Sequence, residues 1–459
     1  MNISRPYAVA LVIFLLALSV RLYFLPFSLF DDRPFIGETV AYDGYYEIAN
    51  NIMGGHGFTR SAAPPYVPDS ARLPLYPLFI AGILNIFGSY KALFIIQALL
   101  GSASAVIAWM IAREFLGPRL SATVGVLTAL EPYTAYLTGV ILTETTFTVF
   151  FLLSMYLFLR YLKNKNLYTL ALTSALLGIA TLIKPTAQYI PLFLLILALW
   201  NSSFNFKKFL LKEAPMVLGI FLIVLSPWMY RNYEVFGNAS LNVEPASALF
   251  AVLVPSTIAL EQRISYDEAT RQFLASQNVQ SIEDVNLGNT GEFTQRALAE
   301  LWHHPKGLAK SIGITMYAFF THDGYAGLLN NFFHVGISYA HPPVLELIMH
   351  PREAVFFFGN LMQGPGAIVI LGRLFWIAIT LLALAGTLLY WVKRGFTPQF
   401  LFITGVIAYF ALTTIIVGLG VNVRYRIPVE PLLLILAAFA LESISRKLTE
   451  SRATETAGS

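Results

Sequence analysis

Apolar runs of about 20 residues recur along the chain, and this repetition is what most limits the folds open to it. A helix of that length spans the hydrocarbon core of a bilayer. Only helices and closed barrels satisfy their own backbone hydrogen bonds there. Of the 459 residues, 56% are hydrophobic and only 12% are charged, which is too polar-poor for a soluble chain of this length. The sequence therefore predicts an all-α polytopic membrane protein.

Most of these runs are long enough to cross the membrane, and two are shorter. The short run 74–89 carries two prolines. A full crossing there would place the basic turn Arg113–Arg119 outside, against the positive-inside trend. We therefore expect 74–89 and 308–325 to cross incompletely, within a bundle of about 10–12 transmembrane helices. The expected full spans are 7–27, 92–112, 119–139, 141–161, 168–184, 186–200, 210–230, 368–392, 398–420 and 426–445.

The spans divide the chain into four parts, with juxtamembrane helices expected in the outer loops. Basic pairs at 163/165, 207/208, 393/394 and 446/447 place both termini in the cytoplasm and the two long loops outside. Loops this long in a compact chain usually carry function. The parts are a module 1–232 with a first outer loop 28–73, a large outer region 233–367, C-terminal helices 368–448 and a small polar tail 449–459, expected to be disordered.

Composition excludes several kinds of site. The chain has no cysteine, so disulfides, thiol catalysis and cysteine–metal sites are excluded. The net charge is only +4 and the Lys and Arg residues are scattered, so we expect no nucleic-acid partner. The densest acidic cluster before residue 260 lies between Asp31 and Arg72, in the first outer loop.

A short helix is predicted inside that loop. Tyr45, Ile48, Ala49 and Ile52 follow the spacing of one helix face, and the pair Gly54-Gly55 ends the pattern. We expect this helix to lie along the membrane surface, with Asp43 at its start. From the spacing alone, Asp43 is either an N-cap or a catalytic carboxylate that takes a proton from an acceptor.

Five ordered motifs then resemble bacterial GT-C glycosyltransferases, nearest to the protein O-mannosyltransferase and aminoarabinose transferase group. Each motif is weak alone, and the ordered set covers about 1–232 and 295–448. The motifs are YxxIAxNIxxGHGF from Tyr45 to Phe58, Arg72-Leu-Pro-Leu-Tyr-Pro, Leu142-Thr143-Glu144, Pro227-Trp228-Met-Tyr-Arg231-Asn232 and Arg424-Tyr425-Arg426-Ile-Pro428.

The resemblance implies a GT-C helical bundle, a polyprenyl-phosphate sugar donor and inverting transfer with a loop Asp as base. Asp43 is the implied base. Relatives usually place the acid four residues before the tyrosine, where this chain has Ala41, so Glu38 remains an alternative base or partner.

Cations at the predicted outer helix ends fit the same chemistry, because the leaving lipid phosphate gains negative charge. The alternatives are that these cations pair with Glu234, Glu244 or Glu430, or contact lipid headgroups. The candidate donor-phosphate residues are Arg231, Arg424, Tyr425, Arg426 and Lys184.

Three further residues are candidates for substrate contact: Tyr45, Glu144 and His56. Glu144 has two open interpretations, since a carboxylate at a helix start also favours the helix dipole. The remaining histidines match no compact metal motif. We expect His303-His304 to have a structural role in the loop and not to bind a ligand. A divalent ion, Mg or Mn, stays possible at His56 with an acidic residue.

The sequence thus predicts a membrane glycosyltransferase of a bacterial or archaeal plasma membrane, with its active site on the outer face. The expected partners are a polyprenyl-phosphate sugar, a lipid, glycan or protein acceptor, and membrane lipids. The rival functions are a flippase for lipid-linked sugars, which would show paired mid-span charges and matching broken helices, and a polysaccharide polymerase.

Overall fold

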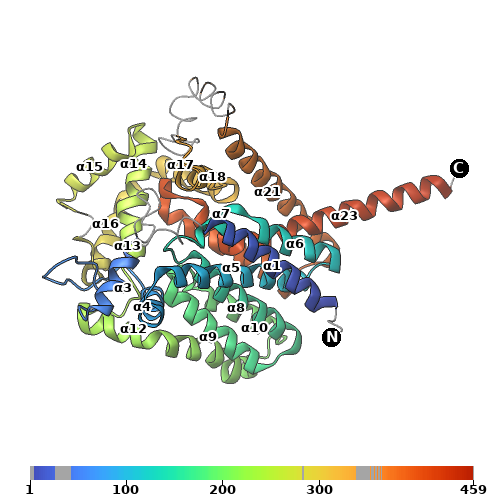
Figure 1. The fold of residues 1–459 in the computed structure, drawn as a ribbon, viewed down its shortest axis with the longest axis horizontal. Helices are drawn as coiled ribbons and strands as arrows, with labels where there is room; N and C mark the ends of the chain where they lie inside the picture. Colours follow the sequence, from blue (N-terminus) through green and yellow to red (C-terminus); the bar gives the residue numbers. More distant parts are fainter. Residues whose placement is uncertain are drawn as a thin grey trace.

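The computed structural model describes residues 5–25, 43–281, 284–337 and 364–457, with four isolated residues between 352 and 362. Within these ranges the regular secondary structure is helical, and β-pairing is limited to one isolated bridge between Thr59 and Pro68. The all-α prediction is confirmed. Figure 1 shows one long bundle, with α3 (Tyr45–Met53) and a further group of helices at one end and the C-terminal helix projecting from the other.

Eight helical segments of the described chain are long and apolar enough to cross a membrane. Three shorter apolar helices accompany them: α4 (Leu75–Phe87), α9 (Leu167–Ile183) and α10 (Ile190–Asn201). The eight segments are Pro6–Phe24 in α1, Tyr90–Ala112 (α5), Glu144–Asn164 (α8), Phe206–Phe236 ending in α12 (Ile220–Phe236), Glu244–Gln262 ending in α14 (Val254–Gln262), Gly366–Arg394 (α21), Pro398–Gly420 containing α22 (Pro398–Thr414), and Ile427–Ser445 within the final turns and α23 (Glu430–Ala457).

Three boundaries differ from the expectations. The expected span 119–139 is divided into α6 (Pro118–Leu130) and α7 (Pro132–Leu137), because Glu131 has extended backbone angles before Pro132. A proline disfavours helical geometry at the residue before it, which explains the break. The segment Glu244–Gln262 lies in the region expected outside the membrane. Helix α23 runs on to Ala457, through helix-forming Glu, Arg and Ala residues where we expected a disordered tail.

The segment Glu244–Gln262 helps to build a small subdomain with its own core around Phe250, which we call the Phe250 subdomain. It packs against α15 (Tyr266–Ser276), α16 (Thr290–His303) and the first part of α17 (Pro305–Thr321). Phe250 lies at the centre, with ring centroids 4.7 Å from Phe273 and 4.8 Å from Phe293. Burial of this apolar surface against protein explains how an apolar run can occur in a region expected outside the membrane.

Helix α8 is a largely buried helix of the bundle, and its length shows how far apart the two ends of the bundle are. It packs against α5 and α9, and most of its residues are buried. Its 21 residues span about 31 Å, close to the hydrocarbon thickness. Glu144 begins it, while Lys163 near its far end pairs with Glu114. The chain segments around Glu144 and Glu114 therefore lie at opposite ends of a membrane-length helix.

A buried ion pair joins three elements next to the start of α23. The side chain of Arg426 is fully buried and donates to Glu430 Oε1 at 3.1 and 3.2 Å. It also donates to the carbonyls of Phe319 in the last turn of α17 and of His322 just after it, and its guanidinium lies 3.8 Å from the Trp376 ring of α21. One arginine thus satisfies polar groups of α17 and α23 while packing on α21.

We predict that Arg426→Ala destabilises the protein by about 3–5 kcal/mol, because Glu430 is left buried without its partner. The measurement is thermal unfolding in detergent micelles. The double variant Arg426→Met/Glu430→Leu should recover part of the loss, since apolar replacement of both partners removes the unpaired charge.

The matched control is Arg296→Ala, which breaks the exposed pair with Glu292 and should cost less than about 1 kcal/mol. Equal unfolding temperatures for Arg426→Ala and Arg296→Ala would contradict the structural role of Arg426.

Candidate active site

A cavity of about 540 Å³ opens where the first loop, the end of α9, the Phe250 subdomain and α22 meet. Its polar side chains come from segments that are far apart in sequence, including Asp43, Arg72, Lys184, Glu244 and Arg424. Its apolar side is formed mainly by α22 and the turn after it, between Phe410 and Val417. We call it the charged pocket.

Helix α3 places Asp43 in this pocket. The helix begins after Gly44, whose φ of 74° is in the left-handed region that glycine favours, and no side chain caps it. The predicted short helix is therefore present, but Asp43 is not its N-cap. Gly54 and Gly55 end the helix as predicted, with Gly55 at a φ of 76°.

Three carboxylates and three cations alternate in a series at the charged pocket; five of them line it, and the sixth, the buried Glu144, contacts two of those five. Glu144 is 2% exposed and accepts from Lys184 Nζ at 2.9 Å and from Arg424 Nε at 2.6 Å. The other arm of Arg424, Nη2, donates to Asp43 Oδ2 at 2.9 Å. Arg72 then contacts Asp43, with Nη2 3.7 Å from Oδ1, and forms an ion pair with Glu244. We call this series the charge chain: Lys184, Glu144, Arg424, Asp43, Arg72 and Glu244.

The electrostatics of the chain keep its arginines charged. Burial alone would lower the pKa of Arg72, but the carboxylates around it, Glu244 first, hold that pKa above its ordinary value. Burial likewise opposes the charge of Arg424, and Glu144 and Asp43 hold its pKa well above the ordinary value. The pKa of the neighbouring Tyr425 is raised to about 12 by burial, so this phenol is neutral and can donate a hydrogen bond.

Aromatic rings support the chain from beside it. Arg72 lies 5.5 Å over the Tyr45 ring, and Tyr45 packs edge-on against Tyr76 of α4. Lys184 lies 5.6 Å from the ring of Tyr425. Tyr45 and Tyr425, both predicted site residues, therefore border the charged pocket and contact its cations.

Two predicted phosphate-binding residues lie elsewhere. Arg426 belongs to the buried pair with Glu430, one of the alternatives that the sequence left open. Arg231 donates to Asp69 O at 3.0 Å and to Asn232 Oδ1 at 2.9 Å, and its guanidinium lies among three aromatic rings. Those rings are Phe58, Trp228 and Phe236. Neither arginine lines the charged pocket.

Arg231 instead lies next to a separate apolar groove. This groove is bordered by α3, α4, α9 and α12, and two of its lining residues, Phe58 and Trp228, also contact the Arg231 guanidinium. The segment 71–75 separates the groove from the charged pocket, since Arg72 and Leu73 line one and Pro74 and Leu75 line the other.

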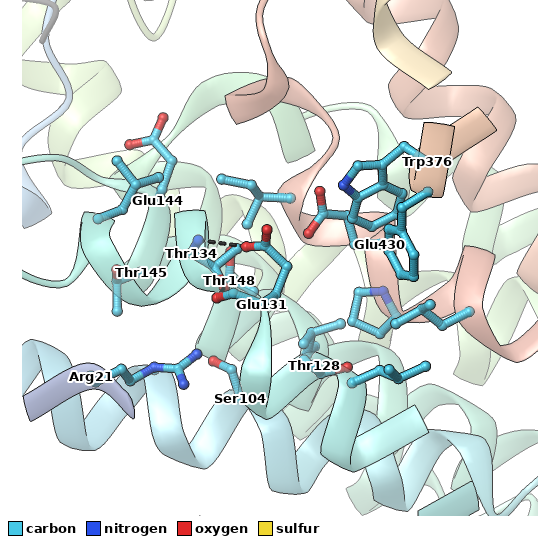
Figure 2. A pocket seen from close by; sticks show the side chains of 18 residues that line it. Arg21, Ser104, Thr128, Glu131, Thr134, Glu144, Thr145, Thr148, Trp376 and Glu430 are labelled. Carbon is cyan, nitrogen blue, oxygen red and sulfur yellow. Dashed lines mark hydrogen bonds between the residues drawn. The ribbon is translucent and has the colours of Figure 1, made fainter. Parts of the chain in front are cut away.

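A third, narrow cavity lies inside the bundle. Figure 2 shows Glu131 and Glu430 directed into it from different elements, with Thr134 donating to Glu131 and Trp376 beside Glu430. Arg21 lines its far side and donates to the carbonyls of Ala17 and Ala129. Glu144 borders this cavity as well, so its carboxylate lies between the charged pocket and the interior.

The described residues do not fit a divalent metal site. They contain no group of three or more His, Asp or Glu side chains that could hold an ion. The carboxylate of Asp43 already faces two guanidinium groups, which would repel a second cation. The ring of His56 stacks on Tyr66 with centroids 4.2 Å apart, outside the charged pocket. Glu38 lies outside the described residues, and its role stays a prediction.

Sequence reasoning missed two members of the charge chain. Arg72 was noticed only as the start of a motif, and Glu244 only as a possible partner of another arginine. The available signal for Arg72 was a cation on the predicted outer side, at the start of the short apolar run, which is the same signal that selected Arg231 and Arg424.

The chain is similar to known membrane glycosyltransferases in part of its sequence and in its fold. Residues 68–230 match the model of the dolichyl-phosphate-mannose-protein mannosyltransferase family. No curated protein sequence gives a significant match. Among solved structures, the apo oligosaccharyltransferase of Archaeoglobus fulgidus matches with a TM-score of 0.54 and 14% identity, over 99% of this chain and 52% of that one.

Two further structures give likenesses of different strength. The archaeal oligosaccharyltransferase AglB from Archaeoglobus fulgidus, in complex with an inhibitory peptide and a dolichol-phosphate, matches with a TM-score of 0.52 and 15% identity, over 98% of this chain and 52% of that one. ArnT from Cupriavidus metallidurans, bound to undecaprenyl phosphate, has a TM-score of 0.38 and 16% identity, over 94% of this chain and 77% of that one.

This chain therefore spans about half the length of the oligosaccharyltransferase that it matches. At 14–15% identity, the two likenesses with TM-scores above 0.5 establish the architecture. The motif resemblance, the family model over 68–230 and the shared architecture agree, and the protein has the GT-C fold of membrane glycosyltransferases.

Proposed function

We propose that the protein is an inverting glycosyltransferase that moves a sugar from a polyprenyl-phosphate donor to a lipid, glycan or protein acceptor. The observation that carries this proposal is the charge chain. It places a carboxylate, Asp43, beside cations that suit a phosphate, in a pocket with an apolar wall. A base, a phosphate site and a lipid surface are what transfer from a lipid-linked sugar requires.

The donor is best accommodated along α22. Leu412 is 63% exposed and lines the charged pocket together with Val417, so an isoprenoid chain can pack there from the bilayer. Its phosphate then reaches Lys184 and Arg424, which lie in the same pocket. AglB, whose fold this chain shares, has been solved with a dolichol-phosphate, and this supports a polyprenyl-phosphate donor.

In the proposed reaction Asp43 takes the proton of the acceptor hydroxyl. The acceptor oxygen attacks the anomeric carbon with inversion, and the bond from that carbon to the phosphate oxygen breaks. The electron pair leaves with the lipid phosphate, which gains one unit of negative charge. Lys184 and Arg424 stabilise that charge by charge-assisted hydrogen bonds. Glu144 holds both cations in position through its own two hydrogen bonds.

We further propose that the site faces the outer aqueous side. Glu144 lies at one end of α8, and Arg160 and Lys163 lie near the other, where both contact Glu114. The ring of Phe115 packs 6.4 Å from Tyr390, near the basic end of α21. Basic residues gather on the cytoplasmic side. This supports a cytoplasmic position for that end, for both termini, and an outer position for Asp43 in a bacterial or archaeal plasma membrane.

Asp43→Asn is predicted to lower the turnover of purified enzyme by about 10²–10⁴-fold, because the amide cannot accept the acceptor's proton. The assay uses labelled polyprenyl-phosphate sugars with membrane acceptors, and donor binding should persist. Asp267→Asn on α15 is the control and should stay near wild type. Near-normal turnover of Asp43→Asn together with loss in Glu38→Gln would transfer the base role to Glu38.

Lys184→Ala is predicted to raise the KM for donor by about ten- to a hundredfold, the value of one charge-assisted hydrogen bond. Arg231→Ala should change it less, because Arg231 lies outside the charged pocket. Steady-state kinetics with varied donor make the comparison. A larger donor defect in Arg231→Ala would place the lipid phosphate at the apolar groove instead.

The orientation is tested with single-cysteine variants, which are clean reporters because the chain has no native cysteine. In intact cells a membrane-impermeant maleimide should label Ser61→Cys on the loop after α3 and leave Arg113→Cys unlabelled until the membrane is opened. Strong labelling of Arg113→Cys from outside would reverse the proposed topology.

A further inference from the structure

One wall of the charged pocket is built from two short segments that are about 170 residues apart and are held in register. The backbone N–H of Val243 donates to Ser70 O at 3.0 Å. The amide Nδ2 of Asn242 donates to Ala71 O at 3.1 Å, and Arg72 pairs with Glu244. We call this wall, formed by residues 70–72 and 242–244, the paired wall. Its contacts fix Asn242 and Glu244 relative to the charge chain.

Asn242 presents a buried acceptor without a partner. The residue is 6% exposed, and its Oδ1 has no hydrogen-bond partner among the described residues. The amide orientation is set by its surroundings, because a flip would turn Oδ1 toward the carbonyl of Ala71. Buried polar atoms are normally paired, and leaving one unpaired is unfavourable. Asn242 lines the charged pocket, so a donor from a ligand in that pocket would complete its hydrogen bonding.

Two more polar groups of the same pocket support a ligand rich in hydroxyl groups. Thr186 Oγ1, beyond Lys184, is also buried without a partner in the described chain. The side chain of Glu244 is 40% exposed, and Oε1 is the oxygen that contacts Arg72. The paired wall therefore offers an amide oxygen and a carboxylate, which are both hydrogen-bond acceptors.

The pocket thus has two chemically different parts. Lys184 and Arg424 suit an anion, whereas Asn242 and Glu244 suit O–H or N–H donors. A glycosyl phosphate has the same polarity, with a phosphate at one end and hydroxyl groups at the other. A sugar carboxylate would meet the acceptor oxygen of Asn242 and the negative charge of Glu244, and both contacts are repulsive.

We infer that Asn242 and Glu244 recognise the donor sugar through its hydroxyl hydrogens and select sugars without a carboxylate over uronic-acid sugars. This inference rests on the proposed function and specifies the substrate class of the same pocket. Both residues act on specificity, and the proton transfer remains with Asp43.

The test compares kcat/KM for each pair of enzyme variant and synthetic donor, as in a double-mutant cycle. Polyprenyl-phosphate hexoses and pentoses are screened with wild type, and the best donor is then made in each monodeoxy form and as its uronic acid. For wild type, one monodeoxy donor should lose at least tenfold in kcat/KM. In Asn242→Ala the parent donor should lose a similar factor, and that monodeoxy donor should show no additional loss. Glu244→Gln should raise the use of the uronic-acid donor relative to the parent.

Asn232→Ala is the matched structural control. Asn232 holds the carbonyls of Ser240 and Leu241, just before the paired wall, and it does not line the charged pocket. Its loss should lower kcat/KM for all donors by one factor and leave the deoxy ratios unchanged. A purely structural role of Asn242 would give that same uniform pattern.

The outcomes separate the two proposals. Transfer by wild type with unchanged deoxy ratios in Asn242→Ala and an unchanged uronic-acid ratio in Glu244→Gln would overturn this inference and leave the proposed function standing. Absence of transfer from every polyprenyl-phosphate sugar by folded wild type would overturn the proposed function and the inference with it.

Discussion

The site depends on the ion pair between Glu144 and Arg424, which joins residues 280 positions apart. A carboxylate that is 2% exposed at the start of a membrane-length helix is strongly unfavourable without partners. The N-terminus of α8 compensates part of the charge, and Lys184 and Arg424 compensate the rest. Satisfying this one carboxylate brings the end of α9 and the turns before α23 to the same place.

Because Arg424 also reaches Asp43, the charge balance of the proposed reaction is local. The charge chain holds three carboxylates and three cations, so before the reaction it has no formal net charge. When Asp43 takes a proton it loses its negative charge, while the leaving phosphate gains one. Arg424 donates to Asp43, and in the proposed reaction it also binds the phosphate, so its interaction would pass from Asp43 to the phosphate without a large movement. Such fixed charges need little reorganisation during the reaction, which is the usual advantage of a preorganised site.

Local signals in the sequence predicted the fold well. Apolar length gave the helical bundle, and the spacing of four apolar residues with a Gly pair gave α3 at the correct place. The break at Glu131 was also local and could have been recognised from Pro132.

The roles of individual charged residues could not be predicted from their neighbours in sequence. Whether Asp43 is a cap or a pocket carboxylate is decided by Arg424, 381 residues away. Arg424 and Arg426 share one motif, yet short turns direct one into the pocket and the other into the core. Asn242 gave no sequence signal, because its unpaired oxygen arises only when residues 70–72 and 242–244 pair.

The region that matches the family model contains only part of the charge chain. Residues 68–230 contain Arg72, Glu144 and Lys184, while Asp43, Arg424 and Glu244 lie outside the matched region. Three of the ionic contacts in the chain cross that boundary: Arg424 with Glu144, and Arg72 with both Asp43 and Glu244. The matched region therefore supplies one buried carboxylate and two cations, and the rest of the chain supplies the other members. Since an unpaired buried charge is unfavourable, the matched region cannot form this site alone. The candidate base, Asp43, lies outside the matched region. The paired wall joins residues 70–72 inside that region to residues 242–244 outside it.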